Sequence, residues 1–123
     1  MPADGFYEWR GARAERQPLW FHAREGGHLA FAGLAAGDGD LAFVILTTTA
    51  NSLVAPYHDR MPVLLSPEGI DAWLARGDSS VLAAAPEGWL AMREASQRVN
   101  LVANDGPELL DPPTPTAQLK LDL

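Results

Sequence analysis

The order of short apolar runs along this chain constrains its fold more than any other feature of the sequence. Strand-like runs cover residues 6–10, 18–23, 28–34 and 41–49 near the start and residues 90–95 and 98–102 near the end. Helix-like segments occupy the middle. Strands, then helices, then strands are typical of α+β domains with a mainly antiparallel sheet. We therefore predict an α+β fold.

Turn residues separate these runs. Residues 24–27 (REGG) supply the glycines that a hairpin turn requires, so residues 18–23 and 28–34 are predicted to form a hairpin. Residues 11–17 and 36–40 are predicted as a loop and a turn. The run LAFVILTTT at 41–49 is too continuously apolar for a half-exposed strand, so we expect it in the core.

The strongest helix signal lies at residues 66–77. Ser66 is a preferred N-cap, Pro67 suits the first helical position, and Gly77 suits the C-cap. One apolar face is formed at helical spacing by Ile70, Trp73 and Leu74. Shorter helices are predicted over 51–55 and 80–85, with residues 49 and 79 as alternative starts. Residues 1–112 are predicted to form one domain, and residues 113–123 a proline-broken tail.

Composition sets limits on function. The 123 residues contain no cysteine, which excludes disulfides, thiolate metal sites and cysteine nucleophiles within them. Neither a signal peptide nor a transmembrane run is present, so we expect a cytoplasmic protein without a membrane partner. The net charge of −7 argues against broad, non-specific nucleic-acid binding, although an acidic protein can carry a local basic groove.

Two clusters combine ionisable and aromatic side chains. In the first, Glu8 lies between Tyr7 and Trp9. If the Glu8 carboxyl is buried beside these rings, its pKa rises and it can act as a general acid. Alternatively, Glu8 alternates outward from a strand into water, as most glutamates do.

The second cluster, residues 57–62 (YHDRMP), lies between a helix-like and a strand-like segment. A histidine in such a loop can transfer protons near neutral pH, and an arginine can hold a phosphate. The alternative is a capped turn in which Asp59 and Arg60 form a surface ion pair. The three histidines show no metal-ligand spacing, so we expect no metal and no cofactor.

Both clusters carry a resemblance to a known family. GFYEW at 5–9, TTTANSLVAPYHDRMPVLL at 47–65 and NDGPELL at 104–110 resemble the SRAP (SOS response-associated peptidase) family. Its members bind abasic sites in single-stranded DNA. The resemblance covers residues 2 to about 112. It implies a compact α+β fold with a curved, barrel-like sheet and short helices.

The resemblance also implies an activity in the DNA damage response. Family members begin Met-Cys-Gly-Arg, and the exposed N-terminal cysteine closes a thiazolidine with the aldehyde of an abasic site. The assisting glutamate and histidine correspond to Glu8 and His58, and an arginine that binds DNA phosphate corresponds to Arg60. Thr48 matches a site threonine less securely. No metal is used, and the expected partner is single-stranded DNA with an abasic site.

The chemistry of these residue types agrees with the implied roles. Schiff-base formation and sugar-ring opening each need proton transfer, which suits Glu8 and His58. Trp9 or Met61 can stack on or wedge against a neighbouring base.

The family's N-terminal segment, with its cysteine, site asparagine and neighbouring arginine, has no counterpart in these residues. Its strands would be missing from the sheet, so we expect an exposed sheet edge, apolar surface and self-association. Three functions stay open: abasic-site capture completed by that segment, a non-catalytic DNA- or protein-binding module, and an inactive remnant.

Overall fold

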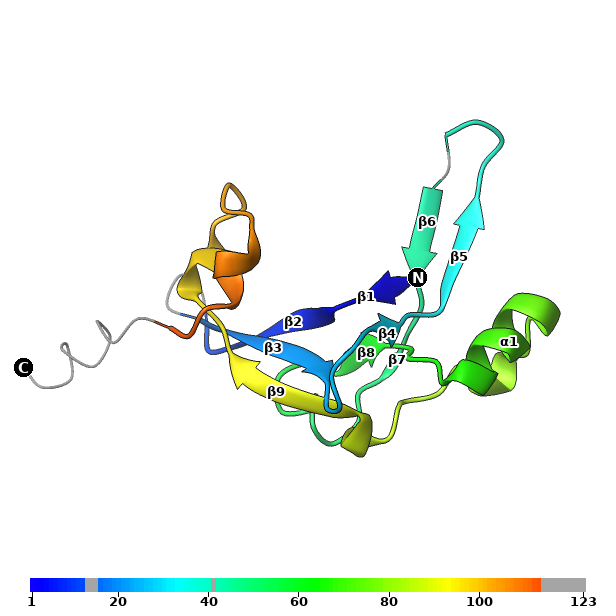
Figure 1. The fold of residues 1–123 in the computed structure, drawn as a ribbon, viewed down its shortest axis with the longest axis horizontal. Helices are drawn as coiled ribbons and strands as arrows, with labels where there is room; N and C mark the ends of the chain where they lie inside the picture. The colour runs from blue at the N-terminus through cyan, green and yellow to red at the C-terminus, as the bar shows by residue number, and fades with distance from the viewer. Residues whose placement is uncertain (13–15, 41, 114–123) are drawn as a thin grey trace, which may run out of the picture. The chain divides into compact units, whose positions relative to one another are not determined.

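The structure is a computed structural model that describes residues 1–12, 16–40 and 42–113. It divides into two compact units (Figure 1). Unit 1 contains Met1–Gly5 and His22–Ala91, and unit 2 contains Phe6–Phe21 and Met92–Leu123. Each unit has its own set of strands and its own buried residues, and each is described separately below.

Unit 1 contains three small antiparallel sheets of two strands each. Strand β1 (Pro2–Ala3) pairs with β4 (Leu29–Ala30), β5 (Gly33–Ala36) with β6 (Ala42–Ile45), and β7 (Thr47–Thr49) with β8 (Arg60–Pro62). Backbone bonds connect the last two sheets near their ends: the Leu46 amide donates to Ala32, and the Val63 amide donates to Leu46. Buried residues along these segments include Phe31, Val54 and Val63.

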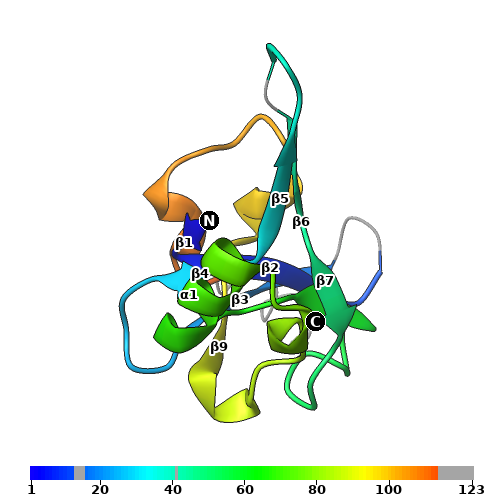
Figure 2. The ribbon, with the colours of Figure 1, turned by 90° about the vertical axis from the view of Figure 1, so that its right-hand side faces the viewer.

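Helix α1 (Pro67–Arg76) follows the strands of unit 1 (Figure 2). The Ser66 hydroxyl accepts the Gly69 amide at 3.0 Å, and Gly77 ends the helix with a φ of 57°. That left-handed conformation carries little penalty for glycine, which explains the stop. The helix predicted at 66–77 is thus confirmed at both ends. Two 3-10 turns, η2 (Ser79–Val81) and η3 (Glu87–Trp89), come after it.

Unit 2 is formed mostly by a three-stranded sheet of order β2-β3-β9, with β2 at Gly5–Arg10, β3 at Gln17–Ala23 and β9 at Leu90–Glu94. Two 3-10 helices follow, η4 (Gln97–Asn100) and η5 (Pro107–Leu110). Phe6 stacks on the buried Phe21 with ring centroids 5.2 Å apart. This contact joins the two neighbouring strands on one face of the sheet.

The mixture of small sheets with one α-helix agrees with the predicted α+β class. Within the described ranges these sheets do not close into a barrel, so the barrel-like sheet stays a prediction. The predicted tail lies almost wholly outside the described residues, which end at residue 113. Residues 13–15 of the predicted loop and residue 41 also lie outside them.

The predicted hairpin of residues 18–23 and 28–34 is wrong in its pairing. The turn exists, and Gly26 and Gly27 take φ values of 81° and 83°. However, β3 lies between β2 and β9, whereas β4 pairs with β1. Local turn chemistry predicted the change of direction correctly but could not predict which distant strands would compete for pairing.

The expectation that residues 41–49 form one core strand is also wrong. The segment contains two strands, β6 and β7, with a break at Leu46. Every residue of β6 is exposed. Phe43 and Val44 have exposed fractions of 61% and 53%. An unbroken apolar run indicates only that burial is favourable, and nothing in the described part of the chain covers this one.

Three further predictions of secondary structure are wrong. Residues 98–102, predicted as a strand, form η4 and a turn, because the Ser96 hydroxyl accepts the Arg98 amide and starts a 3-10 turn. The predicted helices over 51–55 and 80–85 shorten to turns and to η2. Asn51 and Asp78 each bond to backbone amides just ahead of them, which favours turns over longer helices.

Candidate functional site

The strand pair β7–β8 positions the predicted His58–Arg60 site in unit 1. Thr49 lies opposite Arg60 in the register, and the Ala50 amide donates to the Asp59 carbonyl at 2.9 Å. These contacts close a loop of turns over residues 50–59 at its base. His58 therefore lies where the loop returns to the sheet, and Arg60 is the first residue of β8.

Asn51 fixes the path of this loop. Its side-chain oxygen accepts the amides of Leu53 and Val54, both at 3.1 Å, and its Nδ2 donates to the Ala85 carbonyl at 2.9 Å. The Val54 carbonyl in turn accepts the His58 amide at 3.1 Å. The sequence predicts only a short helix over residues 51–55 here. An asparagine followed by serine is instead typical of a turn closed by its own side chain.

The His58 ring has hydrogen-bond partners for two protonation states. Its Nδ1 lies 3.0 Å from the Arg60 amide nitrogen and 3.0 Å from the Arg60 carbonyl oxygen. A bare Nδ1 can accept from that amide, and a protonated Nδ1 can donate to that carbonyl. The Asp59 carboxylate lies 3.5 Å from Nδ1. When Nδ1 donates to the Arg60 carbonyl, Nε2 is the ring nitrogen that can bind or release a further proton.

The Arg60 guanidinium is held against β7. Its Nη2 donates to the Thr47 carbonyl at 2.8 Å, and both Nη2 and Nε lie 3.3 Å from the Thr47 hydroxyl. The arginine remains exposed. A fixed and exposed guanidinium is suited to binding an anion such as phosphate, because little side-chain freedom is lost on binding. Thr47 was not predicted as a site residue, whereas its neighbour Thr48 was.

Thr48 and Met61 lie opposite each other on β7 and β8. Thr48 is half-buried, whereas Met61 is only 1% exposed and its sulfur accepts the Asn51 amide at 3.3 Å. The hypothesis that Met61 wedges against a DNA base does not agree with this burial. Its burial and its contact with Asn51 make it a packing residue in this structure.

The first cluster lies in unit 2, on β2. Side chains alternate along a strand, and the ring contacts follow this alternation. Phe6 stacks on Phe21, while Tyr7 contacts Trp9 and Trp20 with centroids 6.2 and 4.8 Å away. Glu8 has the parity of Phe6, so it does not lie between the Tyr7 and Trp9 rings. It is half-buried, which differs from the alternative of an outward, solvated carboxylate.

Trp9 is fixed by two contacts within unit 2. Its indole N–H donates to the Asn100 side-chain oxygen at 2.8 Å, and the Arg16 guanidinium lies 4.7 Å from its ring centroid. Asn100 also donates to the Arg16 carbonyl at 2.9 Å, so one amide links both residues. Neither Arg16 nor Asn100 was predicted, because only the fold brings residues 16 and 100 to Trp9.

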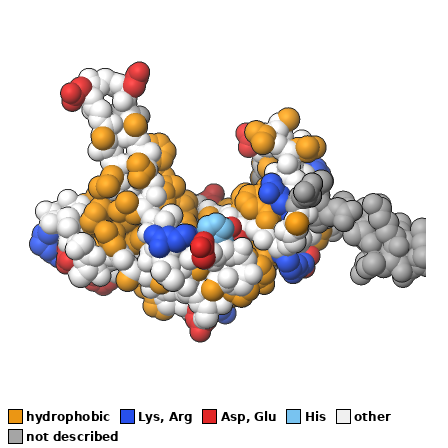
Figure 3. Space-filling model, turned by 180° about the vertical axis from the view of Figure 1, so that it is seen from behind, with side chains coloured by type: hydrophobic (Ala, Val, Ile, Leu, Met, Phe, Trp, Pro, Cys, Tyr) orange, Lys and Arg blue, Asp and Glu red, His pale blue; other side chains and the backbone are white. Residues whose placement is uncertain are grey.

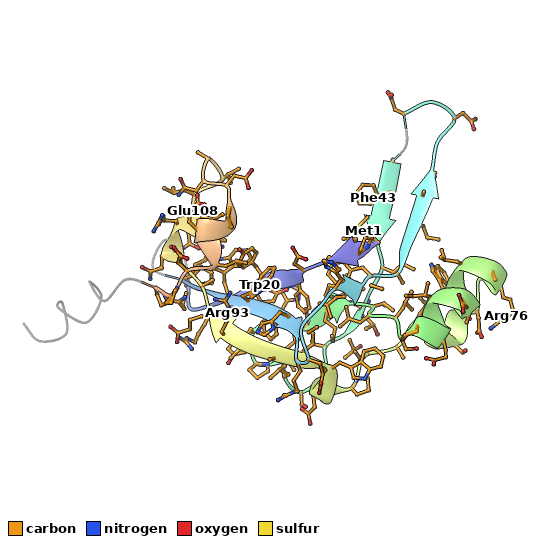
Figure 4. The ribbon with its side chains drawn as sticks, in the orientation of Figure 1. Met1, Trp20, Phe43, Arg76, Arg93 and Glu108 are labelled. Atoms are coloured by element: carbon orange, nitrogen blue, oxygen red, sulfur yellow. The ribbon has the colours of Figure 1, made fainter. Side chains whose placement is uncertain are left out.

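Burial beside these rings raises the pKa of Tyr7, and the positive charge of Arg93 partly opposes the rise. Figure 4 shows the labelled Trp20 and Arg93 on this sheet. A neutral, half-buried phenol with aromatic neighbours contributes apolar surface rather than charge at neutral pH.

The structure thus brings His58 and Arg60 together in unit 1, while Thr48 lies on the other face of the β7–β8 pair, opposite Met61. In unit 2, Glu8 and Trp9 lie on opposite faces of β2. A common site that combines the two clusters stays a prediction. No group of three or more His, Asp or Glu side chains with metal-binding geometry occurs in the ranges 1–12, 16–40 and 42–113. None of the helices in those ranges has the length and apolar character needed to cross a membrane.

Comparisons with solved structures agree with the fold. A protein from Bacteroides thetaiotaomicron matches 91% of this chain and 55% of its own chain, with a TM-score of 0.78 and 23% identity. A protein from Bordetella bronchiseptica matches 76% of this chain and 52% of its own, with a TM-score of 0.67 and 26% identity.

Sequence comparisons give the family. The abasic site processing protein YedK of Escherichia coli is 30% identical over 89% of this chain, and YoqW of Bacillus subtilis is 31% identical over 90%. The chain spans about half the length of these relatives, 55% in each case. The family model for SOS response associated peptidases (SRAP) matches residues 1–102. The chain therefore belongs to the SRAP family.

Proposed function

We propose that this chain carries part of an abasic-site binding surface for single-stranded DNA, with His58 and Glu8 as proton-transfer groups and Arg60 as a phosphate contact. Two relatives of this chain are named abasic site processing proteins, and we extend that role to the half of their length that this chain matches. The hydrogen bonding of His58 is the observation that supports it most strongly.

An abasic sugar exists as a closed ring and an open aldehyde, and opening the ring moves a proton to the ring oxygen. A group that gains and loses a proton near neutral pH accelerates this step. His58 suits the role because an Nδ1 that donates to the Arg60 carbonyl keeps its proton in both charge states of the ring, which leaves Nε2 to exchange a proton with the sugar. We assign the half-buried Glu8 to the second transfer, protonation of the hydroxyl that leaves when an amine condenses with the aldehyde.

The remaining residues would hold the strand. Arg60, fixed by Thr47, would bind a phosphate beside the abasic sugar. Thr48 points to the opposite face of this strand pair, with Met61, and would act only by packing beneath the site. Trp9 would stack its ring on a neighbouring base, since such stacking does not depend on the identity of the base. Met61 would act indirectly, by holding Asn51 and the loop that ends at His58.

Capture as a thiazolidine needs a cysteine thiol, which these 123 residues do not contain. The proposal for this chain is therefore binding and proton transfer. Incubated alone with abasic single-stranded DNA, the chain should give no thiazolidine adduct on a denaturing gel. A heat-stable adduct formed without a reducing agent would contradict this assignment.

Fluorescence anisotropy tests the binding directly. A labelled single-stranded oligonucleotide with one abasic site should bind more tightly than the same oligonucleotide with an intact base or as a duplex. Because backbone contacts are shared by all three ligands, only the difference between them reports recognition of the abasic site. Equal affinity for all three ligands would favour the alternative of a non-catalytic binding module. Absence of binding to any of them would contradict the proposal.

A further inference from the structure

The Arg16 side chain of unit 2 is held over an aromatic ring without using its hydrogen-bond donors. Its guanidinium carbon lies over the Trp9 ring, 4.7 Å from the centroid. By contrast, the guanidinium of Arg10 in the same unit donates to the Glu94 carboxylate at 3.0 Å. Across residues 1–12, 16–40 and 42–113, no oxygen accepts a hydrogen bond from the Arg16 guanidinium. Its N–H groups are therefore available to an anionic ligand.

Asn100 connects the main chain of Arg16 to the ring of Trp9. Its Oδ1 accepts the indole N–H of Trp9 at 2.8 Å, and its Nδ2 donates to the Arg16 carbonyl at 2.9 Å. Because each end of the amide has its own partner, only one orientation of the amide satisfies both hydrogen bonds. Asn100 thus fixes the ring and the arginine that covers it in one arrangement.

The surrounding fold holds both ends of this cluster. Asn100 ends η4, which starts after Ser96, and Ser96 is only 2% exposed. The Ser96 amide donates to a carbonyl of η5 at 3.1 Å. On the other side, Gln17, which follows Arg16, donates from its side chain to the Ala95 carbonyl at 2.8 Å. A guanidinium supported in this way loses little freedom when it binds a ligand.

The surroundings of the cluster indicate the class of ligand. The Tyr7 ring lies 6.2 Å from the Trp9 ring and 4.8 Å from the Trp20 ring, measured between centroids. Figure 3 shows basic side chains beside hydrophobic ones on unit 2, at the right of the view. Aromatic rings beside arginine are typical of surfaces that bind single-stranded nucleic acid, because the rings stack on bases and the arginine contacts the backbone. A simple carboxylate would use the arginine but not the rings.

We propose that Arg16 binds a backbone phosphate of single-stranded DNA at a nucleotide whose base stacks on Trp9, and that Asn100 is the positioning residue for this contact. Arg16 covers one face of the Trp9 ring, so the base would stack on the opposite face. The inference rests on the proposed function for its ligand, single-stranded DNA. It does not require the abasic site, because every nucleotide carries a phosphate.

The test is a set of anisotropy titrations with two single-stranded oligonucleotides, one intact and one with an abasic site, at several salt concentrations. Arg16→Gln should lower the affinity for both about fivefold and make the slope of log affinity against log salt shallower by about 0.7, the value for one phosphate on a single strand. The ratio of the two affinities should stay unchanged. Arg98→Gln is the matched control, because Arg98 is an exposed arginine of the same unit, and it should leave the slope unchanged.

Asn100→Leu tests the positioning role without a change in charge. It should make the salt slope shallower, as Arg16→Gln does, because the Arg16 main chain loses its hydrogen bond. The NMR signal of the Trp9 indole N–H should also move upfield, because its acceptor is lost. A purely structural role would lower the free energy of unfolding but leave the slope unchanged. Asn104→Leu is the control, since the Asn104 side chain makes one exposed bond elsewhere on η4.

An unchanged slope in Arg16→Gln would overturn the phosphate contact, as would an equal change in Arg98→Gln. A slope that Asn100→Leu leaves unchanged would overturn the positioning role. Failure of the proposed function would look different: the wild-type chain would bind the intact and the abasic oligonucleotide equally tightly, while Arg16→Gln would still change the slope. A chain that binds neither oligonucleotide would overturn both.

Discussion

Arg60 is the residue whose proposed role can be separated most cleanly from folding. Arg60→Ala should lower affinity for abasic single-stranded DNA about tenfold and reduce the salt dependence by roughly one phosphate contact. Arg76→Ala is the matched control, since it removes the same charge from the last turn of α1 in the same unit. Anisotropy titrations at several salt concentrations measure both effects. Equal losses in the two variants would show a general effect of charge.

Tyr7 provides a prediction for alkaline pH. Its pKa is raised in the folded protein by burial, so the folded state disfavours the tyrosinate more than the unfolded state does. The contribution of Tyr7 to the free energy of unfolding should be complete below pH 10.0, the ordinary pKa, and should be lost as pH rises through the raised value. Tyr7→Phe should therefore reduce the fall in stability above pH 10.0.

Urea unfolding at a series of alkaline pH values measures this effect, and tyrosinate absorbance follows the titration itself. Tyr57→Phe, made in parallel, assigns the remaining tyrosinate signal. An unchanged pH dependence in Tyr7→Phe would contradict the role of burial.

At the scale of single residues, the type of a side chain predicts which chemistry it could perform but not its surroundings. His58 and Arg60 are predicted site residues because their side chains suit proton transfer and phosphate binding, and the structure adds hydrogen-bond partners for both. The surroundings of the Glu8 side chain could not be predicted from its neighbours in the sequence, because side chains of successive residues in a strand point to opposite faces of the sheet. The contacts of Trp9 with Arg16 and Asn100 depend on the path of the chain between them.

Among the elements, the loop over residues 50–59 is the one that carries the candidate site, and Asn51 stabilises it. Asn51→Ala removes three hydrogen bonds, two to turn amides and one to Ala85, and should cost about 1–3 kcal/mol of unfolding free energy. Asn104→Ala is the control, because its side chain makes one exposed bond, to the Arg98 carbonyl, and the cost should stay below about 1 kcal/mol. Urea unfolding measures both, and equal costs would contradict the assignment.

The predictability of each element depended on how local its determinants are. Helix α1 was predicted at both ends because its capping residues act within one turn. Strand pairing was not predictable from local sequence. Strand β3 pairs with β9, which lies far along the chain, and β4 pairs with β1 and not with β3, its neighbour in sequence. The exposure of β6 was unpredictable for a related reason: hydrophobicity alone does not reveal whether another segment is present to cover a strand.

At the scale of the whole molecule, charge is distributed unevenly between the two units. Unit 1 is strongly acidic, while the described part of unit 2 contains four arginines against five Asp and Glu side chains. The net charge of −7 therefore conceals a nearly neutral unit that also contains Trp9 and Trp20. A local surface for DNA is compatible with an acidic protein when the acidic side chains lie mostly elsewhere.

The claim that the two clusters act as one site is tested most directly by NMR titration with abasic single-stranded DNA. The Trp9 indole N–H and the backbone amides of Glu8, His58 and Arg60 can all be followed in one experiment. The account predicts that signals from both clusters shift together and give one dissociation constant. Shifts confined to one cluster, or two different dissociation constants, would contradict a shared abasic-site surface.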